Sequence, residues 1–126
     1  MVCNMIRFSL PFPPSSNGCF KSFAKGKKIM RAKTTRYNNW IKHAPDLDFD
    51  VEFNNPVFIR YTMFFPNDAI RDGQSYLKPS LDYIVKEKVL GDDNRRIVKG
   101  ESWWDGGIDR ENPRVEIEIK ELEKWN

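Results

Sequence analysis

An almost unbroken apolar run between two prolines, VFIRYTMFF at residues 57–65, constrains the fold of this chain more than any other stretch. Proline has no backbone N–H to give to a sheet, so Pro56 and Pro66 mark the two limits of the run. Long apolar runs of this kind are typical of strands that lie inside a sheet. The run therefore predicts a central strand, with the rest of the chain packed around it.

Alternating stretches near both ends of the chain predict two further strands. Residues 5–10 (MIRFSL) alternate apolar and polar side chains and predict an opening strand. Residues 114–122 (RVEIEIKEL) alternate in the same way. Because period-two alternation is typical of strands with one buried face, this last strand is expected to be half-buried, with Glu116 and Glu118 facing outward. A fourth strand is predicted over residues 97–103.

The segments between these strands are predicted to be connections. Residues 105–113 (DGGIDRENP) are expected to form a turn. Residues 46–55 (DLDFDVEFNN) are acidic and alternating, but they lack the glycine and terminal glutamate of an EF-hand loop. They are therefore read as a connection or the entry to an edge strand. Trp103 and Trp104 are expected to pack in the core, with an exposed stacking surface as the alternative.

Two main helices are predicted. The first is expected from Thr34 or Thr35 to the residue before Pro45, and His43 then lies at its surface end. The second has apolar side chains at a helical period over residues 77–88.

A proline sets the start of this second helix. Pro79 is tolerated only in the first helical turn, so the helix should begin near Leu77 or Lys78, and Gly91 is expected to end it. Together, the elements predict one α+β domain over residues 1–126, with a mixed sheet and two main helices packed against it.

Composition narrows the function only slightly. The formal net charge is +3 and the isoelectric point about 8.9, which fits a polyanionic partner but is shared by many other proteins. The two cysteines, Cys3 and Cys19, have no paired spacing, and with one histidine they cannot build a standard zinc site. Free thiols are expected. The sequence shows no signal peptide and no apolar run of membrane length, so a cytoplasmic protein is expected.

The most basic segment is residues 21–33, in which six lysine and arginine residues are interleaved with aromatic side chains. Gly26 in its middle predicts the tip of a hairpin or a mobile loop. A basic segment of this kind is a candidate clamp for the phosphate backbone of a nucleic acid. A solvated run of charge is the alternative, and composition alone does not choose between them.

Carboxylates flank the second helix, with Asp72 before it and Asp92 and Asp93 after it. If the chain returns antiparallel to the helix, these groups can reach one site. Mg²⁺ is usually held by two or three carboxylates and water. Lys78 and Asp82 lie four residues apart on one face of the helix. A bound metal beside a lysine suits phosphodiester hydrolysis, because the metal polarises the phosphate and the lysine neutralises developing charge.

This block, RD-x₅-K-x₃-D followed by DD, resembles the RusA family of Holliday junction resolvases. A second block, LPFPPSSNGCFK at residues 10–21, is similar to the L-P-x-P-P-S-x-N opening of the same family. The resemblance implies a RusA-like fold and a small phage or prophage endodeoxyribonuclease that acts as a homodimer on four-way DNA junctions. It also implies Mg²⁺, or Mn²⁺ in its place.

The resemblance assigns roles residue by residue. Asp72, Lys78 and Asp93 correspond to catalytic positions, and Asp72, Asp92 and Asp93 to metal ligands. The family's first acidic block reads R-D-x-D-N, whereas this chain has Gln74 and Ser75 at the last two positions. Gln74 is expected to offer a neutral carbonyl oxygen to the metal. The residues expected to contact DNA are Asn17, Lys21, Lys25, Lys27, Lys28, Arg31 and Arg71.

The expected function is therefore Mg²⁺-dependent cleavage of Holliday junctions or related branched DNA in recombination and repair, in a bacterial or phage-infected host. One alternative is a family member that binds branched DNA and cleaves it weakly or not at all, because Gln74 removes a charge from the metal site. A second is an unrelated α+β protein with a chance motif match. No membrane partner is expected.

Overall fold

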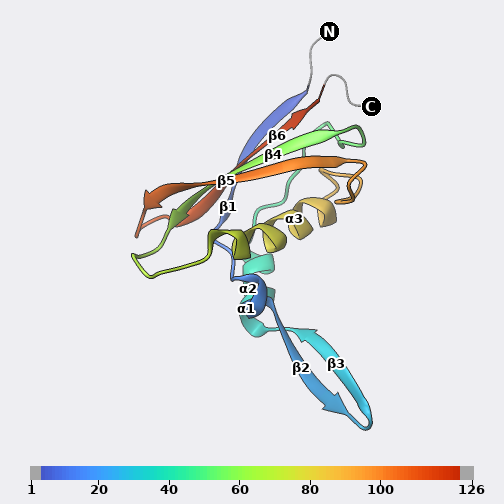
Figure 1. The fold of residues 1–126 in the computed structure, drawn as a ribbon, viewed down its shortest axis with the longest axis vertical. Coiled ribbons are helices and arrows are strands. Elements are labelled where there is room, and N and C mark those ends of the chain that lie inside the picture. The colour runs from blue at the N-terminus through green and yellow to red at the C-terminus, as the bar shows by residue number, and fades with distance from the viewer. Residues whose placement is uncertain (1–3, 123–126) are drawn as a thin grey trace.

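The computed structural model describes residues 4–122, which are organised around a four-stranded mixed sheet in the order β1-β6-β4-β5 (Figure 1). The strands are β1 (Met5–Pro11), β4 (Val57–Phe65), β5 (Val98–Ile108) and β6 (Arg114–Glu121). β6 pairs antiparallel with β1 and β4, and β4 pairs parallel with β5. The expected opening, central and final strands are confirmed, as is the α+β class with a mixed sheet.

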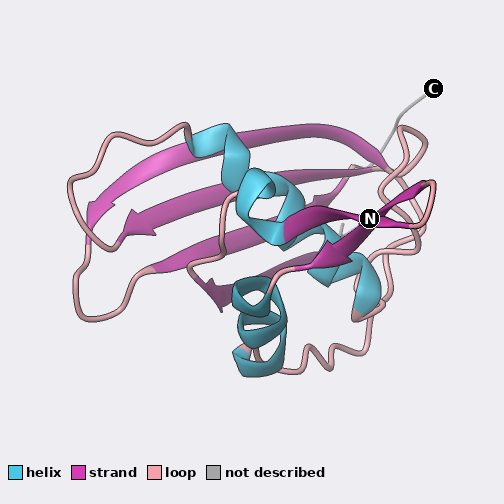
Figure 2. Ribbon diagram, turned by 90° about the horizontal axis from the view of Figure 1, so that it is seen from below, coloured by secondary structure: helices cyan, strands magenta, loops and turns pink. Residues whose placement is uncertain are grey.

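The central strand is buried on one face only. The side chains of Val57, Ile59, Tyr61 and Met63 are fully buried, whereas Phe58 and its alternate neighbours along β4 are partly or fully exposed. The reason is that the helices all lie against one face of the sheet, as seen from below in Figure 2. The other face is left without a covering layer.

The first helix follows its sequence signals closely. α2 (Thr35–His43) begins after Thr34, whose hydroxyl accepts a hydrogen bond from the backbone N–H of Tyr37, and it ends at Ala44 before Pro45. Trp40 is buried, and its indole N–H donates to the carbonyl of Pro11 at 2.8 Å. This bond ties α2 to the end of β1. His43 is exposed at the end of the helix, as expected.

The second helix begins as expected and ends earlier. A 3-10 turn, η1 (Gly73–Tyr76), leads into α3 (Leu77–Lys86), with Pro79 in the first turn. The prediction that Gly91 ends the helix is wrong. Lys88 adopts a left-handed conformation with φ of 62°, which turns the chain before Gly91 is reached.

Beyond this turn the chain runs back toward the start of β4. Val89 and Leu90 are buried, and Leu90 forms an isolated parallel bridge with Phe53. Residues 46–55 therefore form a connection, as expected.

The prediction for the fourth strand was too short. β5 continues to Ile108, so the turn predicted over residues 105–113 is limited to the residues after it. The prediction that Trp103 and Trp104 pack in the core is also wrong, since 38% and 56% of their surfaces are exposed. β5 ends the strand order of the sheet, so its side chains have neighbours on one side only.

The basic segment forms a hairpin that is separate from the main sheet. β2 (Phe20–Lys25) and β3 (Lys28–Lys33) pair antiparallel and project away from the body of the molecule (Figure 1). Gly26 has a φ of 64° in the connecting turn, a left-handed conformation that glycine adopts without steric cost. The prediction of a hairpin tip at Gly26 is confirmed.

A one-turn helix, α1 (Ser16–Cys19), precedes the hairpin and buries a cysteine. Cys19 is a free thiol with 2% of its surface exposed, and burial raises its pKa to about 11. Cys3 lies outside the described residues. No helix within residues 4–122 is both long enough and apolar enough to span a membrane.

Candidate functional site

The sequence-predicted lysine lies at the centre of an ion-pair cluster. Lys78 is in the first turn of α3, and its Nζ lies 3.0 Å from Oδ1 of Asp82 and 2.9 Å from Oδ2 of Asp93. Asp82 is one turn further along the helix, and Asp93 comes from the loop before β5. The chain reversal after α3 therefore brings the loop carrying Asp93 back to the start of the helix.

The two carboxylates hold Lys78 in its charged form. Hydrogen bonds to Asp93 first and then to Asp82 raise the pKa of Lys78 well above its ordinary value. The lysine side chain is 60% exposed, so the ammonium group also remains accessible from solvent. An ammonium group has three donor hydrogens, and two of them point to these carboxylates. The third can be offered to an incoming anion.

Asp92 has a different position from its neighbour. Its Oδ1 accepts from the backbone N–H of Asp93 at 2.7 Å, and its Oδ2 accepts from the side-chain amide of Asn94 at 2.9 Å. The backbone hydrogen bond, followed by the bond from Asn94, lowers the pKa of the Asp92 carboxyl. Asp92 is therefore an ionised group that shapes the loop in which Asp93 lies.

Asp72 is held in place by a capping interaction. It precedes η1, and its Oδ1 accepts a hydrogen bond from the backbone N–H of Gln74 at 3.1 Å. Its backbone carbonyl accepts from the N–H of Ser75 at 3.1 Å. Arg71 contacts the carbonyls of Asn67 and Ala69 in the exposed loop after β4. Residues 71–76, the start of the block of the resemblance, thus form a loop and a 3-10 turn.

The structure does not bring the predicted metal ligands into one group. Among residues 4–122, no three His, Cys, Asp or Glu side chains form a group that could hold a metal ion. Asp72, Asp92 and Asp93 thus do not form a three-carboxylate cluster here. Asp93 shares its carboxylate with Lys78, while Asp72 caps η1.

The proline-rich opening block lies beside the Lys78 cluster. Ser16 donates its hydroxyl hydrogen to the carbonyl of Ser75 at 2.8 Å, although the two residues are 59 positions apart. Ser16 also lines a small pocket of about 120 Å³ that contains Lys78 and Asp82, and Arg31 of the hairpin lines it too. Three separate parts of the chain therefore border one pocket: the opening block, the basic hairpin and the start of α3.

The remaining predicted DNA contacts lie on the hairpin and on the short helix before it. Arg31 lies near the base of the hairpin, with its Cζ 3.8 Å from the centre of the Phe20 ring. Lys21 and the three lysines at positions 25, 27 and 28 are exposed along the hairpin and at its tip. Asn17 lies in α1, next to Ser16. All of these residues lie on the side of the molecule that carries the hairpin.

One contact of the site has no obvious signal in the sequence pattern. Trp103 covers Gly73, and a Cβ at this glycine would overlap the six-membered ring of the indole. The sequence places the two residues 30 positions apart, and parallel pairing of β4 with β5 brings them together. Trp103 was predicted as a core residue, whereas it shields the backbone beside Asp72.

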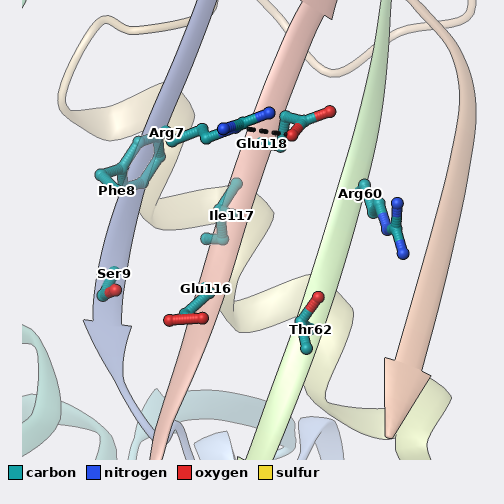
Figure 3. Close-up of a pocket in the computed structure, with 8 residues that line it drawn as sticks. All are labelled: Arg7, Phe8, Ser9, Arg60, Thr62, Glu116, Ile117 and Glu118. Carbon is teal, nitrogen blue, oxygen red and sulfur yellow. Dashed lines mark hydrogen bonds and ion pairs between the residues drawn. The ribbon is translucent and has the colours of Figure 1, made fainter. Parts of the chain in front are cut away.

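A second, larger pocket lies on the uncovered face of the sheet (Figure 3). Its volume is about 420 Å³, and it is lined by side chains of both charges. Arg7 Nε and Glu118 Oε2 are 2.8 Å apart across it, and Arg114 lies 3.5 Å from Glu116 nearby. Since its carboxylates are already paired with arginines, this face offers no uniformly positive surface to DNA.

Comparison with protein-family models and with curated proteins gives no match to this chain. The resemblance to the RusA family therefore depends only on the two sequence blocks at residues 10–21 and 71–93.

The Gly73–Trp103 contact gives a test of how the site is built. Gly73→Ala should lower the free energy of unfolding by about 1–3 kcal/mol, because the added methyl group has no space under the indole. In a Trp103→Leu background the same change should cost less than about 0.5 kcal/mol, which a double-mutant cycle from urea denaturation would show.

Gly18→Ala is the matched control. A Cβ at Gly18 would lie 3.4 Å from the Ser15 hydroxyl, an ordinary contact, so stability should be unchanged or slightly higher. If Gly73→Ala lowers the free energy of unfolding equally in the parent protein and in the Trp103→Leu variant, Trp103 does not cover Gly73.

Proposed function

We propose that this chain is a RusA-like, Mg²⁺-dependent endodeoxyribonuclease that cleaves four-way junctions or related branched DNA. The observation that supports this most is the meeting of the two resemblance blocks. They are far apart in sequence, yet Ser16 is hydrogen-bonded to the Ser75 carbonyl and both blocks line the pocket at Lys78. A chance match of two separate motifs would not require them to be neighbours in space.

The chemistry follows from the charges in this pocket. Lys78 is held as a cation by Asp82 and Asp93 and can place a hydrogen on a phosphate oxygen, neutralising charge that develops during cleavage. The resemblance makes Asp72 and Asp93 the proposed metal ligands, with Asp92 assisting, although the described residues do not group these three carboxylates. A bound divalent cation would polarise the phosphate and activate water. Asp82 acts as a positioning residue, because it fixes Lys78 from the same helix face.

The basic hairpin supplies the proposed binding surface for the phosphate backbone. Its cations extend from the tip at Lys27 and Lys28 to Arg31, which borders the Lys78 pocket. A phosphate backbone that lies along the hairpin would therefore be guided toward the ion-pair cluster. The site of action would be the cytoplasm of a bacterial or phage-infected host, where branched DNA forms.

A second candidate function is binding of branched DNA without efficient cleavage. Gln74 supplies no charge where the family has an aspartate, and Asp72, Asp92 and Asp93 do not form a three-carboxylate group among the described residues. In this case the hairpin and the Lys78 pocket would hold the junction, and the metal would bind weakly or not at all.

The first test changes the charge at position 74. Gln74→Asp should tighten Mn²⁺ binding by roughly tenfold, since the number of charged ligands tunes such sites, and it should raise junction cleavage. Asp72→Asn should abolish cleavage and leave junction binding intact. Asparagine also caps helical turns, so η1 should be retained. Calorimetric metal titration and cleavage of a synthetic junction with and without Mg²⁺ measure both effects.

The two substitutions must move activity in opposite directions. If Gln74→Asp changes neither metal affinity nor cleavage, position 74 does not face the metal. If the parent protein binds junctions and none of the variants cleaves them with Mg²⁺ or Mn²⁺, the binding function is favoured over the enzyme.

The second test concerns phosphate contacts by the hairpin. Replacing Lys25, Lys27 and Lys28 with alanine should flatten the dependence of log K on log salt by about 0.9 for each lost contact. A triple alanine variant at Lys86, Lys88 and Lys120 removes the same charge from other elements and serves as the control. An equal change of slope in both variants would mean that the hairpin contributes only through net charge.

The third test concerns assembly. We propose a homodimer, because a four-way junction has approximate two-fold symmetry and paired incision needs two sites related by the same axis. Light scattering at micromolar concentration should give twice the mass of one chain for the free protein, or the mass of the junction plus two chains for the complex. A monomer in both states would rule this assembly out.

A further inference from the structure

The tip of the basic hairpin exposes apolar side chains as well as lysines. Ile29 is 82% exposed, and Phe23 and Met30, which are paired across the two strands, are 44% and 40% exposed. Along the hairpin only Phe20 and Ala32 are partly buried. Phe23 and Met30 share one face of the ladder and Ile29 lies on the other, so apolar surface is exposed on both faces beside the tip. Single exposed apolar residues are common on protein surfaces, whereas apolar surface gathered at one projecting tip suits contact with a partner.

The charge around these side chains points to a polyanion as that partner. Residues 1–45 contain no aspartate or glutamate, so every ionised side chain of the hairpin is a cation. Lys25 and Lys28 are opposite each other at the last pair of the ladder, and Ala24 and Ile29 form the next pair. Because successive pairs of a ladder alternate between its two faces, Ile29 lies on the face of Arg31 and Lys33, whereas Lys25 and Lys28 lie on the face of Phe23 and Met30. Cations therefore accompany the apolar side chains on both faces. An apolar protein partner would have to bury these ammonium groups without compensation.

The base of the hairpin holds the tip in a fixed direction. The Arg31 guanidinium stacks on the Phe20 ring, and the Phe20 ring packs against Tyr37 of α2 with 5.5 Å between ring centres. The backbone N–H of Thr34 donates to the carbonyl of Cys19 at 2.9 Å, which closes the hairpin at its base. An arm of about six residue pairs at roughly 3.3 Å per residue extends about 20 Å. It is long enough to reach across a DNA groove.

We propose that this hairpin enters branched DNA at the branch point and packs Ile29 against base faces that have lost a stacking neighbour. The inference rests on the proposed function and extends it to how branched DNA is distinguished from linear DNA. The major groove admits a two-stranded β-ribbon, and apolar side chains inserted at base steps unstack them. A linear duplex keeps its base faces stacked. A branch point exposes base faces, so the apolar tip adds to the binding affinity only at a branch point.

The lysines and the isoleucine then have separate roles. Lys25 and Lys28 bind phosphates in any DNA and determine the salt dependence. Ile29 gains contact only with unstacked bases and determines the preference for branched DNA. Since Arg31 lies at the base of the same arm and borders the Lys78 pocket, the tip would position the phosphates near the branch point over that pocket.

The test compares Ile29→Thr with the parent protein on a four-way junction and on a linear duplex of the same arm sequence. Threonine keeps the β-branched shape that favours a strand and removes apolar surface. Affinities are measured by fluorescence anisotropy in EDTA, so that no strand is cut. The junction affinity should fall about tenfold, equivalent to about 1.4 kcal/mol, while duplex affinity and salt slope stay within about twofold.

A second measurement reports on the bases themselves. With 2-aminopurine at the branch point, binding of the parent protein should raise the emission, because unstacking relieves quenching, and Ile29→Thr should raise it less. Met5→Thr, at a 46% exposed apolar residue on β1, is the control and should change neither affinity nor emission.

Each outcome bears on the inference. Equal losses of affinity on junction and duplex, or no loss on either, would overturn it while leaving the proposed function in place. If the parent protein itself shows no preference for the junction, the proposed function fails and the role of Ile29 fails with it. Light scattering of the DNA-free protein gives the last outcome: if Ile29→Thr shifts the mass and leaves junction preference unchanged, the tip is a protein contact and the inference is wrong.

Discussion

Burial of one face of β4 is the constraint on which the rest of this structure depends. Val57, Ile59, Tyr61 and Met63 are inaccessible to solvent and form the centre of the core. β6 and β5 flank this strand on its two sides, and the helices cover only the face that these four side chains occupy. The opposite face carries arginine–glutamate pairs and exposed aromatic rings. One-sided burial thus separates a packed layer from an open surface.

The ion-pair cluster gets its geometry from the packed layer. Leu81 and Ile84 bury one side of α3, which leaves Lys78 and Asp82 on its solvent side. The left-handed residue Lys88 ends this helix region, and the buried pair Val89 and Leu90 ties the returning chain to the core before Asp93. Hydrophobic packing therefore places a lysine between two carboxylates from different elements. The partly exposed position of this lysine leaves it able to meet a phosphate.

Charge is divided between two regions of the chain. The acid-free first 45 residues form β1, the opening block and the hairpin, whereas all of the carboxylates come from the later residues. The fold places the two regions side by side at the pocket shared by Ser16, Arg31 and Lys78. Under the proposed function, a polyanion attracted by the hairpin would in this way reach a site that contains acidic groups. The carboxylates alone would repel it.

The sequence by itself determined the class and the main elements. Proline limits, period-two alternation and helical periodicity located β1, β4, β6, α2 and the start of α3, because these signals act over a few neighbouring residues. It also indicated the hairpin tip at Gly26. Only tertiary structure decided the end of α3, the length of β5 and the exposure of Trp103 and Trp104. These features depend on which strand lies at the edge and which face is covered, and such pairings join residues far apart in the chain. For the same reason no local pattern revealed that Trp103 covers Gly73, or that Asp93 closes on the Lys78–Asp82 pair that the four-residue spacing had placed on one helix face.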